Sequence, residues 1–444
     1  MRVVRNMAVA VVSVLLLVTA LVGPGGGAAQ AAAAQGKLTL VAGQVITATF
    51  SGTKLDKNRQ VSLDKSTDNG VTWTSIKTAK MSSKGAVNFG VVATDPGQYR
   101  AVAKAFTYKV KKKKVTAEAV VSPTGGIAAA DFRDEFNEAP LSDVWRSREE
   151  VGYQASGRWC SAPLSANTSV SGGAAVLKMT AATDPKAVEA AAKERQKEAN
   201  LAAVAKADTA VAKAEANLAK AKAMPQKTKS QKSKRNAAIK KAESALKKAK
   251  SARAALTPGC PTGAYGNAMI TTQGSGQTFQ AGTVVAKVKF SEGQGAHAGI
   301  WLQAANRQEI DIIEAYGYGR GVTNVIHRLV GSKLVKDPAA DKSAYVAAST
   351  VKSKSWWSKW HIVSVSFDES AITFHLDGVK TRQLKGMSAA DYSLVVSLLS
   401  SDWETYRVNK PDVRPGSGVK KSTVKKQKSL PSMSVDWIRV WKKA

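Results

Sequence analysis

Beyond its first 22 residues the sequence has no apolar run long enough to cross a membrane. It is also poor in acidic residues, with 33 Asp and Glu against 66 Lys and Arg, so the formal net charge is +33. Few of these charges can be buried, and such a surface should attract polyanions. Disorder is not indicated, because 44% of the residues are hydrophobic and 10 are Trp.

The first 34 residues have the features of an export signal. Arg2 and Arg5 precede an apolar run over 7–22, and small residues follow, with cleavage patterns at Ala31 and Ala34. A transmembrane anchor is the alternative, but the apolar run is short for a full span. We therefore expect a secreted protein, extracellular or associated with the cell wall, with no membrane span after cleavage.

The length of 444 residues suggests two or three domains. Residues 37–121 alternate in polarity with period two, and the turn dipeptides Asn69-Gly70 and Pro96-Gly97 fall between apolar runs. This pattern predicts a small antiparallel β-sandwich that resembles the immunoglobulin-like accessory modules of secreted bacterial enzymes. Residues 122–130 are expected to form a linker.

Residues 131–444 contain many short strand-like segments without alternating helices. This absence excludes a β-α-β architecture and favours an all-β sandwich or jelly roll. The exception is 185–256, which is rich in Ala and Lys and has 19 Lys and Arg against 6 Asp and Glu, a net charge of +13. Heptad spacing of its few larger apolar residues predicts an inserted antiparallel helical hairpin.

The chain has two cysteines, Cys160 and Cys260, and they bracket the inserted segment. A disulfide between them would close the base of the insertion and keep the host fold intact. Two free thiols are the alternative.

The segment "QEIDIIEAYG", residues 308–317, places three acids in a run that otherwise alternates like a buried strand. In a regular strand Glu309 and Asp311 share one face, whereas Glu314 points to the other. A bulge after Asp311 would add one residue and bring all three acids onto one surface. The isoleucines between the acids indicate that the opposite face is buried core.

Three carboxylates on one face repel one another, and their proximity is costly unless a functional site uses it. They are the groups of a retaining glycosidase, in which one carboxylate attacks the sugar and another donates a proton to the leaving oxygen. An acidic surface patch and a calcium site are the alternatives, although calcium is usually held by loops rich in Gly and Asn.

"EIDIIE", with "GIWLQ" before it, resembles the active-site strand of glycoside hydrolase family 16. The resemblance covers most of 130–444 and includes "DFRDEFNEAPLSDVW", "WWSKWHIVSVSFDESAITFHLDG" and "SMSVDWIRVW". It implies a concanavalin A-like β-jelly roll and retaining endo-hydrolysis of β-linked glucans or galactans. The spacing resembles the laminarinase-like branch with a bulged E-x-D-x-x-E motif. By position, Glu309 matches the nucleophile, Glu314 the general acid/base, and Asp311 the acid that tunes the nucleophile.

Sugar rings stack on aromatic side chains, and their hydroxyls need polar partners. Trp301 is the first candidate for stacking and Trp403 the second, while Asn306 and Gln303 could hydrogen-bond sugar hydroxyls. The resemblance places His327 where laminarinase-like members often have a cleft histidine. A histidine between apolar residues is equally consistent with a place in the core.

The resemblance implies no cofactor for catalysis, and it matches Asp436 to a ligand of a structural calcium ion. The basic segments could hold the enzyme on anionic cell-wall polymers, with a solvated charged surface as the alternative. We expect a monomer and no nucleic-acid partner, because no basic motif is interleaved with aromatics. The competing function is that of a non-catalytic carbohydrate-binding or wall-attached lectin-like protein on the same fold.

Overall fold

The structure is a computed structural model of the chain. It describes the following residues: 36–51, 54–148, 160–257, 259–260, 264–290, 296–316, 321–337, 346, 351, 353–400 and 430–443. The expected signal segment, 1–34, lies outside them. No described helix is long and apolar enough to span a membrane.

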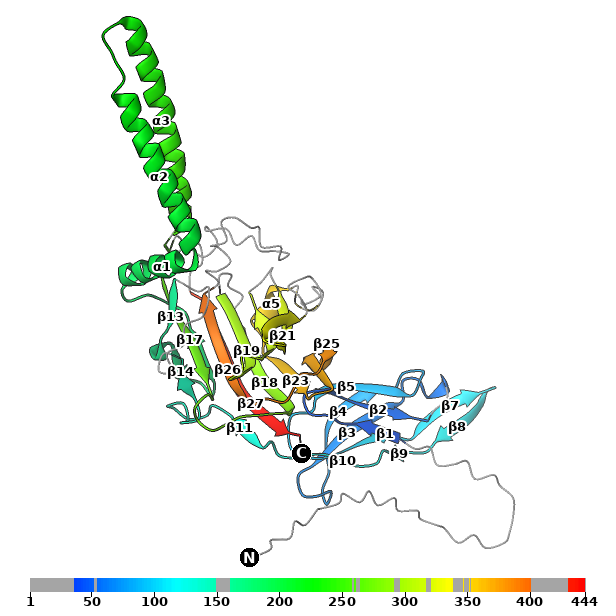
Figure 1. Cartoon of the computed structure of the whole chain (residues 1–444). Helices are drawn as coiled ribbons and strands as arrows, with labels where there is room; N and C mark the ends of the chain where they lie inside the picture. The colour runs from blue at the N-terminus through cyan, green and yellow to red at the C-terminus, as the bar shows by residue number, and fades with distance from the viewer. Residues whose placement is uncertain are drawn as a thin grey trace, which may run out of the picture.

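The N-terminal region is a small β-sandwich of two antiparallel sheets (Figure 1). One sheet has the order β1 (Gly36–Thr39), β2 (Val45–Phe50), β5 (Ala86–Val92). The other has the order β10 (Gly125–Ile127), β6 (Gly97–Ala103), β3 (Gln60–Ser66), β4 (Thr74–Lys80), and β9 (Val120–Val121) also pairs with β6. A separate hairpin joins β7 (Phe106–Val110) and β8 (Lys113–Ala117).

The two N-terminal sheets enclose one apolar core. Alternate residues such as Ile46, Phe89, Leu63 and Tyr99 are buried in it, as period-two patterning requires. The expected linker 122–130 is shorter than predicted, because β10 pairs with β6 and therefore extends the sandwich to Ile127. Strand β10 has only three residues, two of them glycine, and so short a segment shows no alternation that would predict a strand.

The rest of the chain is dominated by two large sheets that face each other across the main core. One sheet, called here the outer sheet, has the order β14 (Thr168–Val170), β15 (Ala175–Lys178), β27 (Ser432–Lys442), β18 (Gly282–Lys289), β23 (His361–Phe367), β24 (Ala371–Leu376), β25 (Val379–Lys385), with β11 (Phe132–Asp134) on β27. The other, called the site sheet, has the order β12 (Arg146–Ser147), β17 (Tyr265–Thr271), β26 (Tyr392–Ser400), β19 (Ala296–Ala304), β20 (Glu309–Ala315), β21 (Val322–Val330), β22 (Lys333–Asp337), with β13 (Ser161–Pro163) and β16 (Thr180–Ala181) on β17. A short helix, α5 (Lys354–Trp357), precedes β23. The described part of the chain is therefore mainly β, as expected.

Three helices interrupt the sheets between β16 and β17: α1 (Pro185–Ala199), α2 (Leu201–Lys222) and α3 (Lys229–Ala255). Figure 1 shows α2 and α3 side by side as a long hairpin that stands away from the sheets. Val204, Ala214 and Ala221 are buried in the seam of α2, whereas α3 has no buried residue. A seam of small side chains brings the two helices together but leaves most of their surface in solvent.

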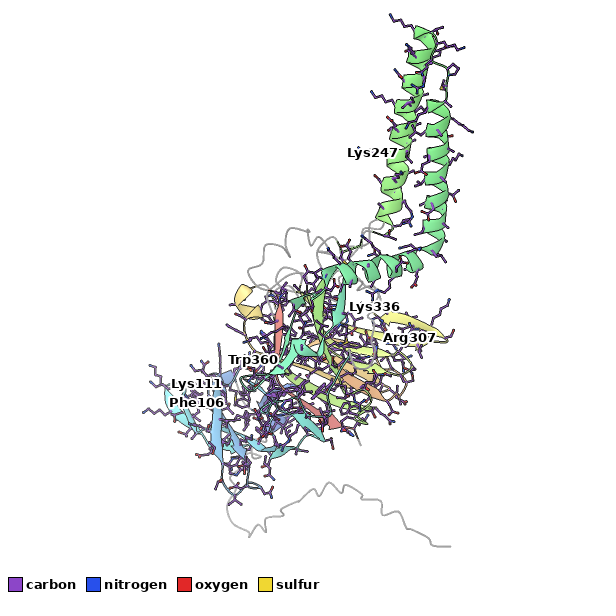
Figure 2. The ribbon with its side chains drawn as sticks, turned by 90° about the vertical axis from the view of Figure 1, so that its left-hand side faces the viewer. Phe106, Lys111, Lys247, Arg307, Lys336 and Trp360 are labelled. Atoms are coloured by element: carbon purple, nitrogen blue, oxygen red, sulfur yellow. A yellow bond between two sulfur atoms is a disulfide. The ribbon has the colours of Figure 1, made fainter. Side chains whose placement is uncertain are left out.

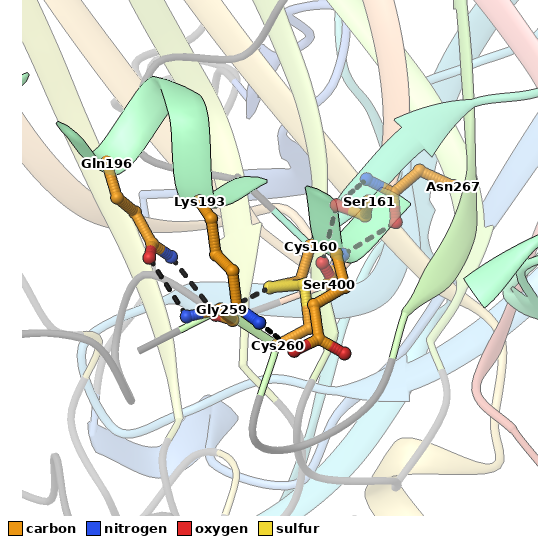
Figure 3. Close-up of a disulfide and its surroundings, with 9 residues drawn as sticks. Cys160, Ser161, Lys193, Gln196, Gly259, Cys260, Asn267 and Ser400 are labelled. Carbon is orange, nitrogen blue, oxygen red and sulfur yellow. Dashed lines mark hydrogen bonds and ion pairs between the residues drawn. A yellow bond between two sulfur atoms is a disulfide. The ribbon is translucent and has the colours of Figure 1, made fainter. Parts of the chain in front are cut away.

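A disulfide joins Cys160 to Cys260, with their Cα atoms 5.4 Å apart, so the predicted pairing is confirmed. Figure 3 shows the contacts that fix the base of the inserted helices around it. The side chain of Gln196 in α1 makes two hydrogen bonds with the backbone of Gly259, each of 3.0 Å. On the other side, Ser161 accepts a hydrogen bond of 2.7 Å from Asn267 of β17. The disulfide thus ties the start and end of the insertion to the site sheet.

The N-terminal sandwich contacts the outer sheet through specific polar groups. Arg439 of β27 donates to Asp95 at 2.9 Å and makes two bonds of 2.8 and 2.9 Å with the carboxylate of Glu135. Ser364 of β23 donates to the carbonyl of Gly43 at 3.0 Å. Trp441 packs against the N-terminal core. These contacts hold the two sandwiches together at the outer sheet. The strand that carries the three acids, β20, belongs to the other large sheet, the site sheet.

Candidate active site

Strand β20 contains the predicted bulge. On the β19 side, Ile300 pairs with Ile313 and the next residue, Trp301, pairs with Asp311, so Ile312 has no partner of its own. On the β21 side, the register also shifts between Asp311 and Glu314. Two residues therefore occupy the space of one, and the phase of the strand changes after Asp311.

The register partners show that the three acids share a face. Across β19, the partners of Glu309, Asp311 and Glu314 are Gln303, Trp301 and Gly299. These are alternate residues of one strand, so they project from one side of the sheet, and directly paired residues project from the same side. Across β21, the partners are His327, Val325 and Thr323, which again alternate.

The opposite face of β20 is core. Ile310, Ile312 and Ile313 are each 1% exposed and belong to the main core between the two large sheets. The bulge explains how consecutive residues Ile312 and Ile313 can both be buried there. The local sequence thus anchors the strand with isoleucines and presents the acids on the other side.

Glu309 lies at the start of β20, where its carboxylate meets several polar groups. Gln303 donates to its Oε2 at 3.4 Å, and the Nε2 of His327 is 3.7 Å from its Oε1. Burial raises the pKa of Glu309 to about 7, and the charge of Glu314 adds to this, while hydrogen bonding with Asp311 and the charge of Lys336 act in the other direction.

Asp311 is the most enclosed of the three acids, at 4% exposed. Burial, together with the charges of Glu309 and Glu314, raises its pKa well above the ordinary range. Like charges this close cannot all ionise, and the interaction between Asp311 and Glu309 acts to raise the pKa of Asp311 and to lower that of Glu309. Asp311 therefore favours the ionised form of its neighbour.

Glu314 has the opposite electrostatic setting. Its Oε1 is 2.9 Å from the Nε2 of His297 and accepts a hydrogen bond of 3.0 Å from the hydroxyl of Tyr316. Its Oε2 accepts a hydrogen bond of 2.8 Å from the hydroxyl of Thr323. Burial acts to raise the pKa of Glu314, but the hydrogen bond and charge of His297, with smaller effects of Lys336 and Thr323, outweigh it and hold that pKa far below the ordinary value.

The structure brings most of the predicted binding residues to this face. Trp301 lies beside Asp311, is 7% exposed, and donates its indole N–H to Ser397 at 3.0 Å. Gln303 bridges Arg148 and Glu309. The Nε2 of His327 lies 3.7 Å from Glu309 and 3.8 Å from Asp311, and its side chain is 25% exposed, so it lies outside the core.

The other two predicted binding residues are not placed at the acids. Asn306 lies in the exposed turn between β19 and β20, and its side-chain oxygen accepts the N–H of Gln308 at 3.1 Å. Trp403 is outside the described residues. A sugar-binding role for either stays a prediction.

Two groups of side chains bear on the metal alternatives. Ligand atoms of Glu309, Asp311 and His327 lie within 4.8 Å of one another, close enough to hold an ion. Calcium prefers oxygen ligands, and an imidazole among the donors does not suit it. Asp436, the expected structural calcium ligand, lies 2.6 Å from the ammonium of Lys287. A cation at this carboxylate does not fit a calcium ion, so the described residues give that prediction no support.

Sequence reasoning missed His297, Tyr316, Lys336 and Arg148. His297 could have been found, because it lies four residues before Trp301 and so shares its face of β19. Lys336 could not, because it reaches the acids only through the pairing of β22 with β21, where it lies opposite His327. Figure 2 shows Lys336 near the edge of the site sheet.

Residues 220–417 match the model of the family described as glycosyl hydrolases family 16. The resemblance to family 16 is confirmed. The matched residues include the whole acidic strand, and the match supports a glycoside hydrolase. No curated protein matches the sequence.

Solved structures similar to this chain include three glucan hydrolases. The laminarinase catalytic domain from Thermotoga maritima MSB8 is 15% identical, with 71% of this chain and 98% of that chain covered and a TM-score of 0.39. The endo-beta-1,3-glucanase from Pyrococcus furiosus is 14% identical, with 76% and 97% covered and a TM-score of 0.40. A beta-1,3-1,4-glucanase (lichenase) derived from a mouse hindgut metagenome is 12% identical, with 70% and 99% covered and a TM-score of 0.38.

Proposed function

We propose that this protein is a secreted endo-β-glycosidase that cleaves a β-linked polysaccharide, a β-1,3-glucan-like polymer or a galactan, with retention of configuration. The observation that carries the proposal is the bulge in β20, which gives Glu309, Asp311 and Glu314 a common face. A family 16 match over the same residues supports the reaction class. A binding protein would not need three carboxylates at this spacing.

In the proposed reaction the Glu309 carboxylate attacks the anomeric carbon while the bond to the leaving sugar breaks. Glu314 gives a proton to the leaving oxygen, and a glycosyl ester remains on Glu309. Water then attacks the ester, Glu314 takes a proton from that water, and Glu309 is released as a carboxylate. Two inversions at the same carbon give net retention.

The pKa values of the three acids shift in different directions, and this difference supports distinct roles for them. Asp311, as the protonated member of its pair with Glu309, would donate a hydrogen bond to the nucleophile and keep it ionised. The same bond would stabilise the carboxylate again when the ester is hydrolysed. Gln303 accepts a hydrogen bond from Arg148 and donates one to Glu309, and it would hold the nucleophile in position.

The reaction can be tested by assaying reducing ends on laminarin, lichenan, agarose and carrageenan. We expect cleavage of one of these polymers, and a loss of roughly 10²- to 10⁴-fold in Glu314→Gln, the usual contribution of a general acid/base. Glu309→Gln should be at least as impaired, and product stereochemistry by NMR should show retention. Glu194→Gln, in the exposed side of α1, is the matched control and should retain activity.

Other results would replace this proposal. Inverted products would contradict an ester on Glu309. If wild type and Glu309→Gln bind a glycan equally and neither cleaves any of the polymers, the protein is the lectin-like alternative.

We also propose that the α2–α3 hairpin binds anionic polymers and so holds the enzyme near its substrate. The inserted segment 185–256 carries a net charge of +13, and no residue of α3 is buried. Lys247 of α3 points away from the partner helix in Figure 2. The two long helices bury few apolar side chains. They place their positive charges away from the two sheets.

The N-terminal sandwich is proposed to be an immunoglobulin-like accessory module of the exported, monomeric enzyme. Mass spectrometry of the protein recovered from culture medium should find a new N-terminus after Ala31 or Ala34. A chain retained in cells with an intact N-terminus would contradict export.

A further inference from the structure

His297 and Glu314 form a close pair on the site sheet. They lie on neighbouring strands, β19 and β20, with the Nε2 of His297 2.9 Å from the Oε1 of Glu314. Their side chains are 14% and 11% exposed. The His297 ring also stacks on Tyr316, with the ring centroids 4.5 Å apart and the planes at 20°. Packing and hydrogen bonding thus fix the imidazole against the carboxylate.

This environment conflicts with the simplest form of the proposed reaction. A general acid must carry a proton when the glycosidic bond breaks. Glu314, however, receives hydrogen bonds from Tyr316 and Thr323 in addition to the contact with His297. Three donors around one carboxylate favour its ionised form.

We propose that His297 holds the proton that Glu314 delivers, so that the general acid is the His297–Glu314 pair and not the carboxyl group alone. This inference rests on the proposed function of the site. At rest the pair is an imidazolium and a carboxylate. During cleavage the Nε2–H bond breaks and the proton moves to Glu314, and the same proton then passes from Glu314 to the leaving oxygen. The imidazole is left neutral and the carboxylate ionised.

The second half of the reaction returns the proton. Glu314 takes a proton from the attacking water, and the neutral His297 accepts it back through Nε2. The pair therefore begins and ends the cycle with one proton. His297 acts through Glu314 and is a positioning and proton-holding residue.

The other charges around the pair come from three strands. Glu309 and Asp311 lie on β20 itself, His327 on β21 and Lys336 on β22. The register partner of His297 on β26 is Leu399, which carries no charge. Lys336 acts on all three acids, so it moves their titrations together and does not distinguish the pair from Glu309. Of the charged and imidazole groups named here, His297 is the one that lies 2.9 Å from the Glu314 carboxylate.

His297→Gln separates a proton-holding role from a purely structural one. The glutamine amide can still donate a hydrogen bond to Glu314, but it has no acidic proton that it could transfer to the carboxylate. The carboxyl must then hold the proton itself, and a carboxyl ordinarily loses its proton about two pH units below an imidazole. We expect the alkaline limb of kcat/KM to move to lower pH by roughly one unit or more. An unmoved limb, or one moved to higher pH, would overturn the proposal.

The leaving group gives a second readout. The phenolate of a dinitrophenyl β-glycoside leaves without protonation. On this substrate kcat/KM, which reports the steps up to the glycosyl ester, should be nearly the same for His297→Gln as for wild type, whereas on the polysaccharide kcat/KM should fall roughly 10²-fold. Equal losses on both substrates would indicate a structural defect and contradict the inference. Tyr316→Phe removes a neutral donor from the same oxygen and is the matched control. Its alkaline limb should not move to lower pH, because the loss of a hydrogen bond to the carboxylate raises the pKa of Glu314.

A measurement without substrate keeps this inference separate from the proposed function. NMR can follow the titration of His297 in the full-length wild type and in Glu314→Gln. If the two groups share a proton, the midpoint for His297 should be at lower pH in Glu314→Gln, because the anion that stabilises the imidazolium is gone. Equal midpoints would refute the pair even in an active enzyme. A shifted midpoint in a protein that cleaves no glycan would establish the pair and reject the glycosidase proposal.

Discussion

Glu309 and Glu314 project from the same face of β20 although they are five positions apart in the sequence. In a regular strand an odd separation places two side chains on opposite faces. Here the extra residue between Asp311 and Glu314 reverses the phase, and the flanking strands pair with both glutamates through alternate residues of one face. The relationship between these two carboxylates is the geometric basis of the proposed reaction.

The bulge predicts that strand phase controls activity. Inserting one alanine between Ile313 and Glu314 should turn Glu314 toward the core side or force a second irregularity. We expect the loss of polysaccharide cleavage to be as large as in Glu314→Gln, measured by reducing ends. An alanine inserted after Asn306, in the exposed turn, should preserve activity. Equal activity of both insertion variants would show that the phase of β20 is unimportant.

The raised pKa of Glu309 predicts a pH-dependent cost to stability. Because its pKa in the folded protein is about 7, against an ordinary 4.5, the folded state binds more protons than the unfolded state between these values. Wild-type stability should therefore fall as pH rises across this interval, by up to about 3 kcal/mol at 1.36 kcal/mol per pKa unit. Glu309→Gln has no such proton, so its Tm relative to wild type should increase from pH 4.5 to 8.

The control for this comparison is Glu194→Gln, whose side chain is largely exposed. Its Tm difference from wild type should be independent of pH. A constant difference for Glu309→Gln as well would show that Glu309 is not held in a protonating environment.

The inserted hairpin predicts that anion binding and hydrolysis can be separated. The side chain of Asn200 donates to the carbonyl of Leu256 at 3.3 Å, so a short glycine-serine linker can replace 201–255. The shortened protein should still cleave the polysaccharide but lose retention on dextran sulfate. Retention of the intact protein should weaken as salt rises, because screening shortens the reach of exposed charges.

Uncharged dextran is the control matrix and should retain neither protein. If the shortened protein binds dextran sulfate as strongly as the intact one, the hairpin is not the anchor. If it loses hydrolysis while remaining folded by circular dichroism, the hairpin belongs to the catalytic unit.

Arg439 predicts coupling between the two sandwiches. Its guanidinium is shared by Asp95 and Glu135, and its side chain is 15% exposed. Arg439→Met leaves both carboxylates without this partner, and we expect a loss of about 1–3 kcal/mol and faster proteolysis between the sandwiches. Arg133, its exposed register neighbour on β11, is the matched control. Equal effects of Arg439→Met and Arg133→Met would assign the result to surface charge alone.

Much of the site could be predicted from local sequence because strand alternation is a local property. The isoleucines at 310, 312 and 313 can all be buried only if the strand contains an extra residue, and the same residue aligns the acids. Trp301 and Gln303 follow from alternation along β19. His297 lies four residues before Trp301, so the same alternation along β19 also predicts that it shares the face of the acids.

Lys336 and Arg148 could not be predicted in the same way. Lys336 acts on the acids because β22 pairs with β21 in one register, and a shift of one residue would turn it to the core side. Arg148 reaches Gln303 from a segment more than 150 residues earlier in the chain. Such contacts depend on which strands become neighbours, and local patterns do not contain that information.

The sequence by itself determined the mainly β architecture, the position of the helical insertion, the bulge and the acids it aligns. These features depend on period, composition and short-range sterics. Only the tertiary structure decided in which direction the pKa of each acid shifts, because a pKa depends on burial and on charges from other strands. That is why the motif indicates a general acid at Glu314, whereas the folded site places that carboxylate beside His297 and favours its ionised form.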